Sequence, residues 1–282
     1  MQEYHLGINV FHDVGVAIVD QDCKPVRIYE ETKFTGRKEE YYLPLATMQQ
    51  IAADGFTKFK SLTWPFDINF LKKTSNDSNL SKTGAVSYEK INKILHAKYD
   101  IENCYSILHH SAHAESVYFS SGFKKAIILI LDGAGDDAAI SVFLGNSNKK
   151  EKLQLIKCVQ PAQFSYGHLY GFVTAFLGYN KGSANTHCGK IMGLSSYGSP
   201  VYYDQIKEIF RKPKSNNIFP SNHKDIFKYL DKNFGASFKI TNKFEKKQAD
   251  LASSIQKFLE DDVIYTLKQI SSEYPDYNNL CL

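Results

Sequence analysis

Residues 126–137 read AIILILDGAGDD, an unbroken apolar run joined to an acidic segment that contains two glycines. Six consecutive apolar residues predict a buried strand, and the polar segment behind them predicts a tight turn. Two further strands are predicted over 138–144 and 153–159, and a helix over 167–177. The sequence therefore predicts a unit of three strands and a helix, with an aspartate-bearing turn after its first strand.

The same order of elements occurs earlier in the chain. Strands are predicted over 4–10, 14–19 and 26–31, His12-Asp13 lies in the first turn, and a helix begins at Pro44. A duplicated unit of this kind is typical of α/β proteins with the actin-like (sugar kinase/Hsp70-type) fold. We expect two lobes, 1–124 and 125–282. We also expect the second lobe to be incomplete, because a strand over the last residues leaves its repeat unfinished.

Composition narrows the class of protein. The chain has 282 residues, 43% of them hydrophobic, and a net charge of +4, with acidic and basic residues interleaved. Such a charge distribution does not indicate a nucleic-acid-binding protein. Five scattered cysteines predict neither a zinc ribbon nor a disulfide framework. The N-terminus lacks the pattern of a signal peptide and the apolar runs are too short to span a bilayer, so we expect a cytoplasmic protein without membrane contact.

His109 and His113 open a predicted helix. Side chains four residues apart lie about 40° apart around a helix, so both imidazoles share one face. With the Asp132 carboxylate they would suit Fe(II), Mn(II) or Zn(II). The alternative is a pair of surface or capping histidines. His110 points about 100° away from His109, which favours a substrate contact over a metal ligand.

Three further groups leave alternatives open. Gly133 and Gly135 would let backbone N–H groups approach a phosphate, or they close an ordinary hairpin. In the pair His12-Asp13 the aspartate would orient a general base, or the two residues simply close a turn. Lys38 and Lys190 are candidate anion contacts, or ordinary surface lysines.

Several segments carry a family resemblance when read in order. They are Leu6-Gly7-Ile8-Asn9 with His12-Asp13, the stretch from Glu31 to Lys38, His109-His110-Ser111-Ala112-His113-Ala114, Ser121-Gly122-Phe123, Asp132-Gly133-Ala134-Gly135, Gly189-Lys190-Ile191-Met192-Gly193-Leu194, Ala252-Ser253-Ser254-Ile255-Gln256 and Asn279-Leu280-Cys281-Leu282. The chain resembles the O-carbamoyltransferases, the family of the nodulation, cephalosporin-pathway and tobramycin carbamoyltransferases.

The resemblance implies a reaction and a set of site residues. A carbamoyl group would move from ATP-derived carbamoyl-adenylate to a hydroxyl of a sugar or natural-product acceptor. A metal, generally iron, would be bound by His109, His113 and Asp132. Asn9, His12, Asp13 and Lys38 would lie on the acceptor and catalytic side, and Gly133 and Gly135 would lie near the nucleotide. Apart from the resemblance, we expect His110 as a substrate contact and Lys190 as a nucleotide contact.

The chain also departs from the family pattern. Cys188 stands where the family has a glutamate. The family continues beyond the position of Leu282 into an adenosine-binding stretch and a domain that makes carbamoyl-adenylate. We therefore expect an N-terminal part that needs a C-terminal carbamoyltransferase subunit. One alternative is a non-catalytic relative that binds a metal or a partner. A third possibility is that the sequence is one piece of a longer chain.

Overall fold

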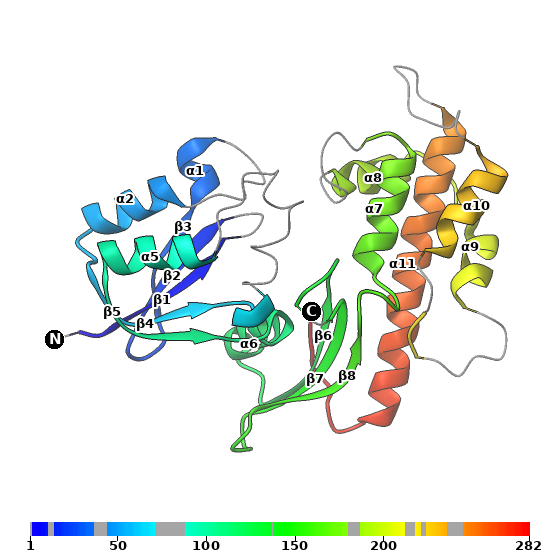
Figure 1. Cartoon of the computed structure of the whole chain (residues 1–282). Coiled ribbons are helices and arrows are strands. Elements are labelled where there is room, and N and C mark those ends of the chain that lie inside the picture. The colour runs from blue at the N-terminus through cyan, green and yellow to red at the C-terminus, as the bar shows by residue number, and fades with distance from the viewer. Residues whose placement is uncertain are drawn as a thin grey trace. The chain divides into compact units, whose positions relative to one another are not determined.

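The computed structural model describes residues 2–10, 14–36, 44–70, 88–136, 138–179, 187–211, 218–220, 224–235 and 245–282. By its internal contacts the chain divides into two units, residues 1–112 and 113–282 (Figure 1). This boundary lies within helix α6 (His109–Ser121), whereas the sequence placed the lobes at 1–124 and 125–282.

The first unit is built on a five-stranded sheet with the order β3-β2-β1-β4-β5. Its strands are β1 (Tyr4–Asn9), β2 (Gly15–Asp20), β3 (Pro25–Glu30), β4 (Lys58–Trp64) and β5 (Asp100–Ser106). The first three form an antiparallel meander, while β4 runs parallel to both β1 and β5. Parallel neighbours need a crossover, and helices supply it here.

The helices of the first unit are α1 (Glu31–Thr35), α2 (Leu45–Ala53) and α5 (Tyr88–Lys98). Apolar residues of α2 and α5 join those of the sheet in one core. The buried Glu31 carboxylate connects α1 to α2, because it accepts the N–H of Ala46 (3.0 Å) and of Thr47 (2.8 Å). These N–H groups belong to the first turn of α2, which has no earlier carbonyl to bind.

The second unit contains a four-stranded sheet with the order β8-β7-β6-β9. Its strands are β6 (Lys125–Leu131), β7 (Ile140–Asn146), β8 (Leu153–Val159) and β9 (Leu280–Cys281). Here too the three consecutive strands form an antiparallel meander, and the later strand β9 lies parallel to β6. The order β8-β7-β6-β9 repeats that of the strands β3-β2-β1-β4 in the first sheet, so the predicted duplicated α/β fold of the actin-like type is confirmed.

The helices of the second unit, besides α6, are α7 (Tyr166–Phe176), α8 (Cys188–Ser195), α9 (Tyr203–Phe210), α10 (Asp225–Asn233) and α11 (Lys246–Glu273). The long helix α11 packs against α7, α8 and α9, and its apolar side contributes to the core of the unit (Figure 1). The core thus extends from the sheet into this group of helices.

Candidate functional site

Three of the predicted metal ligands come together in the structure. His109 and His113 lie in the first turns of α6, and Asp132 follows β6 directly. One ligand atom from each residue lies within 4.8 Å of the others. Two imidazoles and a carboxylate at this spacing are suited to a borderline divalent metal such as Fe(II), Mn(II) or Zn(II). The donor set therefore fits the group that the sequence led us to expect.

Two contacts hold the ring of His109, a hydrogen bond at its edge and a stacked ring on one face. Its Nδ1 lies 3.1 Å from the backbone oxygen of Pro65, and its ring stacks on Phe66 with 4.1 Å between centroids. A carbonyl oxygen only accepts, so Nδ1 must carry the proton in this hydrogen bond. Nε2 then keeps its lone pair for a metal, which is the arrangement usual for ligating histidines.

Helix α6 is fixed against the sheet of the second unit. Ala114 and Tyr118 pack on β6 and β7, and the Tyr118 hydroxyl donates to the backbone oxygen of Lys124 (3.0 Å). A Cβ on Gly145 of β7 would lie 2.4 Å from the Tyr118 ring. Only glycine allows this approach, so Gly145 sets how closely the helix that carries His113 packs on the strand.

The turn after β6 has its own hydrogen bonds. The backbone N–H of Asp132 donates to the backbone oxygen of Ala139 (2.8 Å), and the N–H of Gly135 donates to the backbone oxygen of Ala138 (2.6 Å). The N–H of Gly133 donates to the Asp132 carboxylate (2.6 Å). The turn is thus a closed hairpin whose backbone orients the aspartate side chain.

A cavity of about 420 Å³ lies beside Asp132 in the second unit. Asp132 and Gly133 line it together with residues of α7, α8 and α11, and its surface is mainly apolar. Tyr170 donates to Gln256 (2.6 Å) at its wall, and Thr174 donates to the Cys188 sulfur (3.6 Å). Burial raises the pKa of Tyr170, so its hydroxyl remains neutral at physiological pH.

The other predicted site residues are placed as follows. Asn9 is half-buried at the end of β1, opposite Gly15. His110 is buried, with its ring centroid 6.1 Å from that of His109. Gly135 is buried, and Lys190 is exposed with its ammonium over the Tyr179 ring.

His12, Asp13 and Lys38 lie outside the described residues.

Sequence reasoning missed the contribution of helix α7. Ser165 caps this helix, Gly167 lies against the turn after β6, and His168 is close enough to interact electrostatically with Asp132. Burial lowers the pKa of His168, and the Asp132 carboxylate opposes that effect. The signal in the sequence was weak, because a Ser-x-Gly-His segment has no characteristic spacing of its own.

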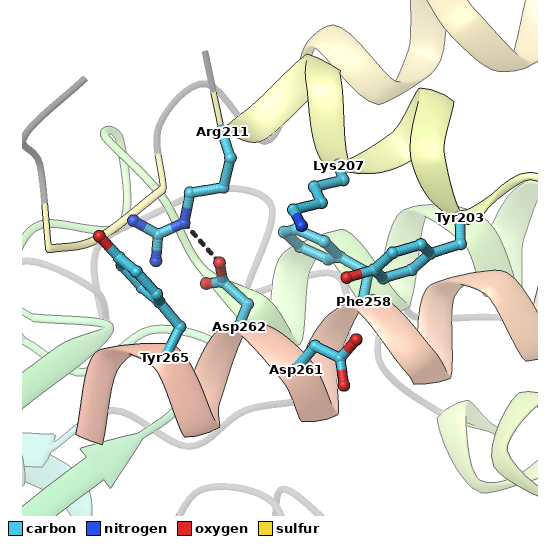
Figure 2. Close-up of a pocket in the computed structure, with 7 residues that line it drawn as sticks. All are labelled: Tyr203, Lys207, Arg211, Phe258, Asp261, Asp262 and Tyr265. Atoms are coloured by element: carbon cyan, nitrogen blue, oxygen red, sulfur yellow. Dashed lines mark hydrogen bonds and ion pairs between the residues drawn. The ribbon is translucent and has the colours of Figure 1, made fainter. Parts of the chain in front are cut away.

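A second cavity of about 400 Å³ lies on α9 and α11, lined by side chains that include Tyr203, Lys207 and Tyr265 (Figure 2). Both aspartates in its wall are ion-paired: Asp262 with Arg211 (2.5 Å) and Asp261 with Lys257 (2.8 Å). Its charged groups therefore neutralise one another to a large extent.

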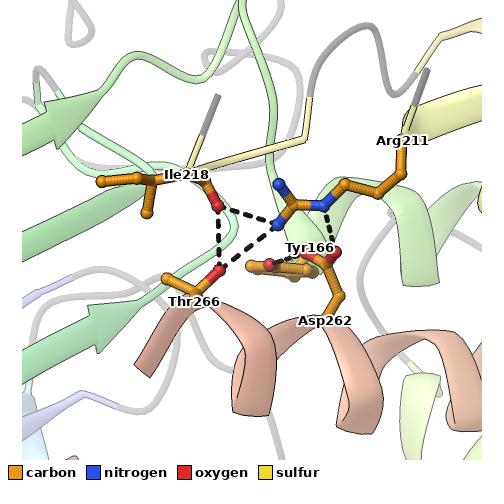
Figure 3. Close-up of polar contacts among 5 residues, drawn as sticks. All are labelled: Tyr166, Arg211, Ile218, Asp262 and Thr266. Atoms are coloured by element: carbon orange, nitrogen blue, oxygen red, sulfur yellow. Dashed lines mark hydrogen bonds and ion pairs between the residues drawn. The ribbon is translucent and has the colours of Figure 1, made fainter. Parts of the chain in front are cut away.

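Asp262 is the centre of a buried polar network in the second unit (Figure 3). The Tyr166 hydroxyl and the Arg211 guanidinium both donate to its carboxylate. Arg211 also donates to the backbone oxygen of Ile218 (2.8 Å), which accepts from Thr266 as well (3.1 Å). The network joins α7, the end of α9 and α11.

Among the described residues, no helix has the length and apolar character that crossing a bilayer requires.

Comparison with known proteins identifies the family. The family model described as "Carbamoyltransferase N-terminus" matches residues 70–282. The protein sll1178 of Synechocystis sp. is 30% identical over 190 residues, 62% of this chain and 29% of that protein. Nodulation protein NolNO of Sinorhizobium fredii is 30% identical over 171 residues, 58% of this chain and 23% of that protein.

The chain therefore spans about a quarter of the length of these curated relatives. Among solved structures, MreB5 of Spiroplasma citri bound to ADP is similar with a TM-score of 0.36 and 10% identity, covering 94% of this chain and 79% of that chain. Because the family model matches well over half of the sequence, the chain belongs to the carbamoyltransferase N-terminus family.

Proposed function

We propose that this chain is the N-terminal part of an O-carbamoyltransferase that transfers a carbamoyl group from carbamoyl-adenylate to a hydroxyl of a small-molecule acceptor. The observation that carries the proposal is the meeting of His109, His113 and Asp132, whose ligand atoms lie within 4.8 Å of one another.

The proposed role of the metal is electrostatic. His109, His113 and Asp132 would hold a divalent ion, Fe(II) in the first instance, which would supply a Lewis acid toward the mixed anhydride of carbamoyl-adenylate. The residues of the chain hold and orient the site. His109 is fixed in one tautomer by the Pro65 carbonyl, and Asp132 is oriented by the N–H of Gly133.

The cavity beside Asp132 is the proposed place for the nucleotide. Its mainly apolar wall suits a base or a ribose face, and Tyr170 and Gln256 offer polar groups there. Gly133 lines this cavity, and we place the phosphate side near Gly133, Gly135 and Lys190. The N–H groups of both glycines are engaged within the turn, so Lys190 would carry the larger share of the phosphate contact.

The acceptor hydroxyl must lose a proton during the transfer. We assign that step to a base at His12-Asp13, with Asn9, Lys38 and His110 contacting the acceptor. The assignments of Asn9, His12, Asp13 and Lys38 rest on the family resemblance, and that of His110 rests on its direction around helix α6. The adenylate would come from a C-terminal carbamoyltransferase subunit, and both chains would act in the cytoplasm.

One observation favours a second candidate function. Cys188 lines the cavity beside Asp132, where the family has a glutamate. A chain that lacks this carboxylate could bind a metal or a partner without catalysing transfer. Metal binding is compatible with both candidates, whereas carbamoyl transfer belongs to the first alone.

A two-stage experiment tests the proposal. Metal analysis of the freshly purified chain, and titration with Co²⁺ followed by visible absorption, measure the site directly. We expect binding by the wild type and a loss of roughly 10-fold or more in affinity for His113→Ala. His96→Ala is the matched control, because His96 is also exposed on a helix but lies outside the cluster. Equal Co²⁺ affinities of the wild type, His113→Ala and His96→Ala would refute the proposed metal site.

The second stage measures transfer. The chain is mixed with the C-terminal part of a carbamoyltransferase, ATP, carbamoyl phosphate and an aminoglycoside or sugar acceptor, and carbamoylated product is detected by mass spectrometry. Product that requires both chains and is lost in His113→Ala supports the transferase. A metal-loaded mixture that makes no product from any acceptor favours the non-catalytic candidate.

A further inference from the structure

The turn that carries Asp132 is attached to the start of helix α7. Ser165, the N-cap residue, is fully buried, and its hydroxyl lies 3.1 Å from the backbone oxygen of Asp132 and 2.6 Å from that of Gly133. The same hydroxyl accepts the N–H of His168 (3.0 Å), which satisfies one unpaired donor of the helix. One side chain thus caps the N-terminus of the helix and binds the turn.

Gly167 brings the two backbones into direct contact. A Cβ at this position would lie 2.6 Å from the Cα of Gly133 and 2.8 Å from its backbone nitrogen. These are backbone atoms, so no change of rotamer can relieve the overlap. The Gly133 nitrogen is also the donor to the Asp132 carboxylate (2.6 Å), so a side chain at residue 167 would act on the hydrogen bond that orients the aspartate.

Helix α7 cannot easily move away from this contact. The Tyr166 hydroxyl donates to the buried Asp262 of α11, and Asp262 is ion-paired with Arg211. Leu169 and Val173 of the same helix are buried in the core of the second unit. A substituent at residue 167 therefore displaces the turn more readily than the helix.

We propose that Ser165 and Gly167 are positioning residues that fix the Asp132 carboxylate in its metal-binding orientation. The inference rests on the proposed metal site, because only a bound metal gives this orientation a function. Neither residue belongs to the cluster of possible ligands formed by His109, His113 and Asp132. Their effect passes through the backbone of Gly133. Gly167 also lines the cavity beside Asp132, so hydrogen exchange of the turn is the measurement that isolates the positioning role.

The test compares Gly167→Ala and Ser165→Ala with the wild type in the full chain. Gly193→Ala is the matched control, since Gly193 also lies in a helix of the second unit and a Cβ there meets nothing within 4 Å. Co²⁺ titration gives the affinity, and its absorption bands report the geometry of the ligands. Amide hydrogen exchange of residues 132–136 reports the turn without any metal.

Expected results are a loss of roughly 10- to 100-fold in Co²⁺ affinity for Gly167→Ala, altered absorption bands, and faster exchange of the turn. Ser165→Ala should behave in the same way to a smaller extent, and it tests the proposal even where Gly167→Ala fails to fold. Gly193→Ala should match the wild type in all three measurements.

The outcomes separate the inference from the proposed function. Wild-type affinity and wild-type exchange in both variants would overturn the positioning role and leave the metal site standing. Faster exchange of the turn in a chain whose wild type binds no Co²⁺ would show that the contact holds the turn. It would still overturn the proposal that the contact serves a metal.

Discussion

Removing the carboxylate of Asp262 should destabilise the second unit strongly. The side chain of Asp262 is 4% exposed and that of Arg211 is 15% exposed, so the ion pair between them is screened very little by water. Asp262→Ala leaves a largely buried guanidinium without its counter-charge, and loss of one partner costs about 3–5 kcal/mol in buried pairs. The Tyr166 hydroxyl loses its acceptor in the same substitution.

Two further variants divide this loss into its parts. Asp262→Asn keeps the size of the side chain and one oxygen acceptor. It should lower the free energy of unfolding by about 1.5–3 kcal/mol, the range for hydrogen bonds to charged groups. Replacing both partners, Asp262→Leu with Arg211→Met, should recover most of the loss, because paired apolar substitutes avoid the burial of charge. The order Ala, then Asn, then the double variant is therefore expected from least to most stable.

Urea unfolding followed by far-UV circular dichroism measures these differences. Most of the helical residues that the structure describes belong to the second unit, so the signal reports mainly on that unit. The chain has one tryptophan, Trp64, and it is buried in the core of the first unit. Its fluorescence supplies an internal control for that unit. A loss below about 1 kcal/mol for Asp262→Ala would refute the reasoning, since that is the range of an exposed pair.

Three other perturbations have defined outcomes. Glu31→Ala should lower the free energy of unfolding of the first unit by about 1–3 kcal/mol, measured by Trp64 fluorescence in urea, because two N–H groups of α2 lose their acceptor. An unchanged midpoint would contradict the capping role. Gly145→Ala should cost about 1–3 kcal/mol in circular dichroism, because the new Cβ would lie 2.4 Å from the Tyr118 ring; a neutral result would mean that the ring can shift. Burial and the Asp54 carboxylate raise the pKa of Tyr29 from 10.0 to about 12. Between these values the unfolded chain loses the proton first, so stability should fall as pH rises from 10 to 12. Tyr29→Phe should fall less steeply in urea titrations at pH 9 and 11, and parallel curves for both proteins would argue against the shift.

Much of the fold could be predicted because burial leaves a clear pattern in the sequence. The run 126–131 is apolar throughout, and the structure buries most of it as β6. Strand β5 leaves a weaker pattern in the sequence. It lies at the edge of its sheet and exposes most of its side chains. Polar residues such as Glu102 and Asn103 can therefore occupy it, and its sequence resembles that of a loop. The pattern of a half-exposed edge strand is weak for this reason.

Strand β4 was not predicted at all. Its buried residues include Phe59, Leu62 and Trp64, but a lysine, a serine and a threonine stand between them, so apolar and polar residues do not alternate regularly. Its place beside β1 depends on a parallel pairing of residues far apart in the chain, which local pattern does not specify.

The candidate site was predictable to the extent that it depends on helical spacing. His109 and His113 share a face because of their separation by four residues, whatever surrounds them. That Asp132 joins them follows from how α6 packs on the sheet. The supporting contacts of Ser165 and Gly167 could not be foreseen, because they join residues more than thirty positions apart through backbone atoms.

The long helix α11 has a consequence for how the chain folds during synthesis. Every strand of the first sheet lies within residues 4–106, so that sheet can assemble as soon as this segment has left the ribosome. The second unit cannot complete its fold at that stage. Asp250 and Ser254 of α11 bind backbone N–H groups near residue 200, and Asp262 binds Tyr166 across 96 positions. Helices α8 and α9 therefore remain without their main helical packing partner until α11 is translated, and during this interval their apolar faces are available to chaperones.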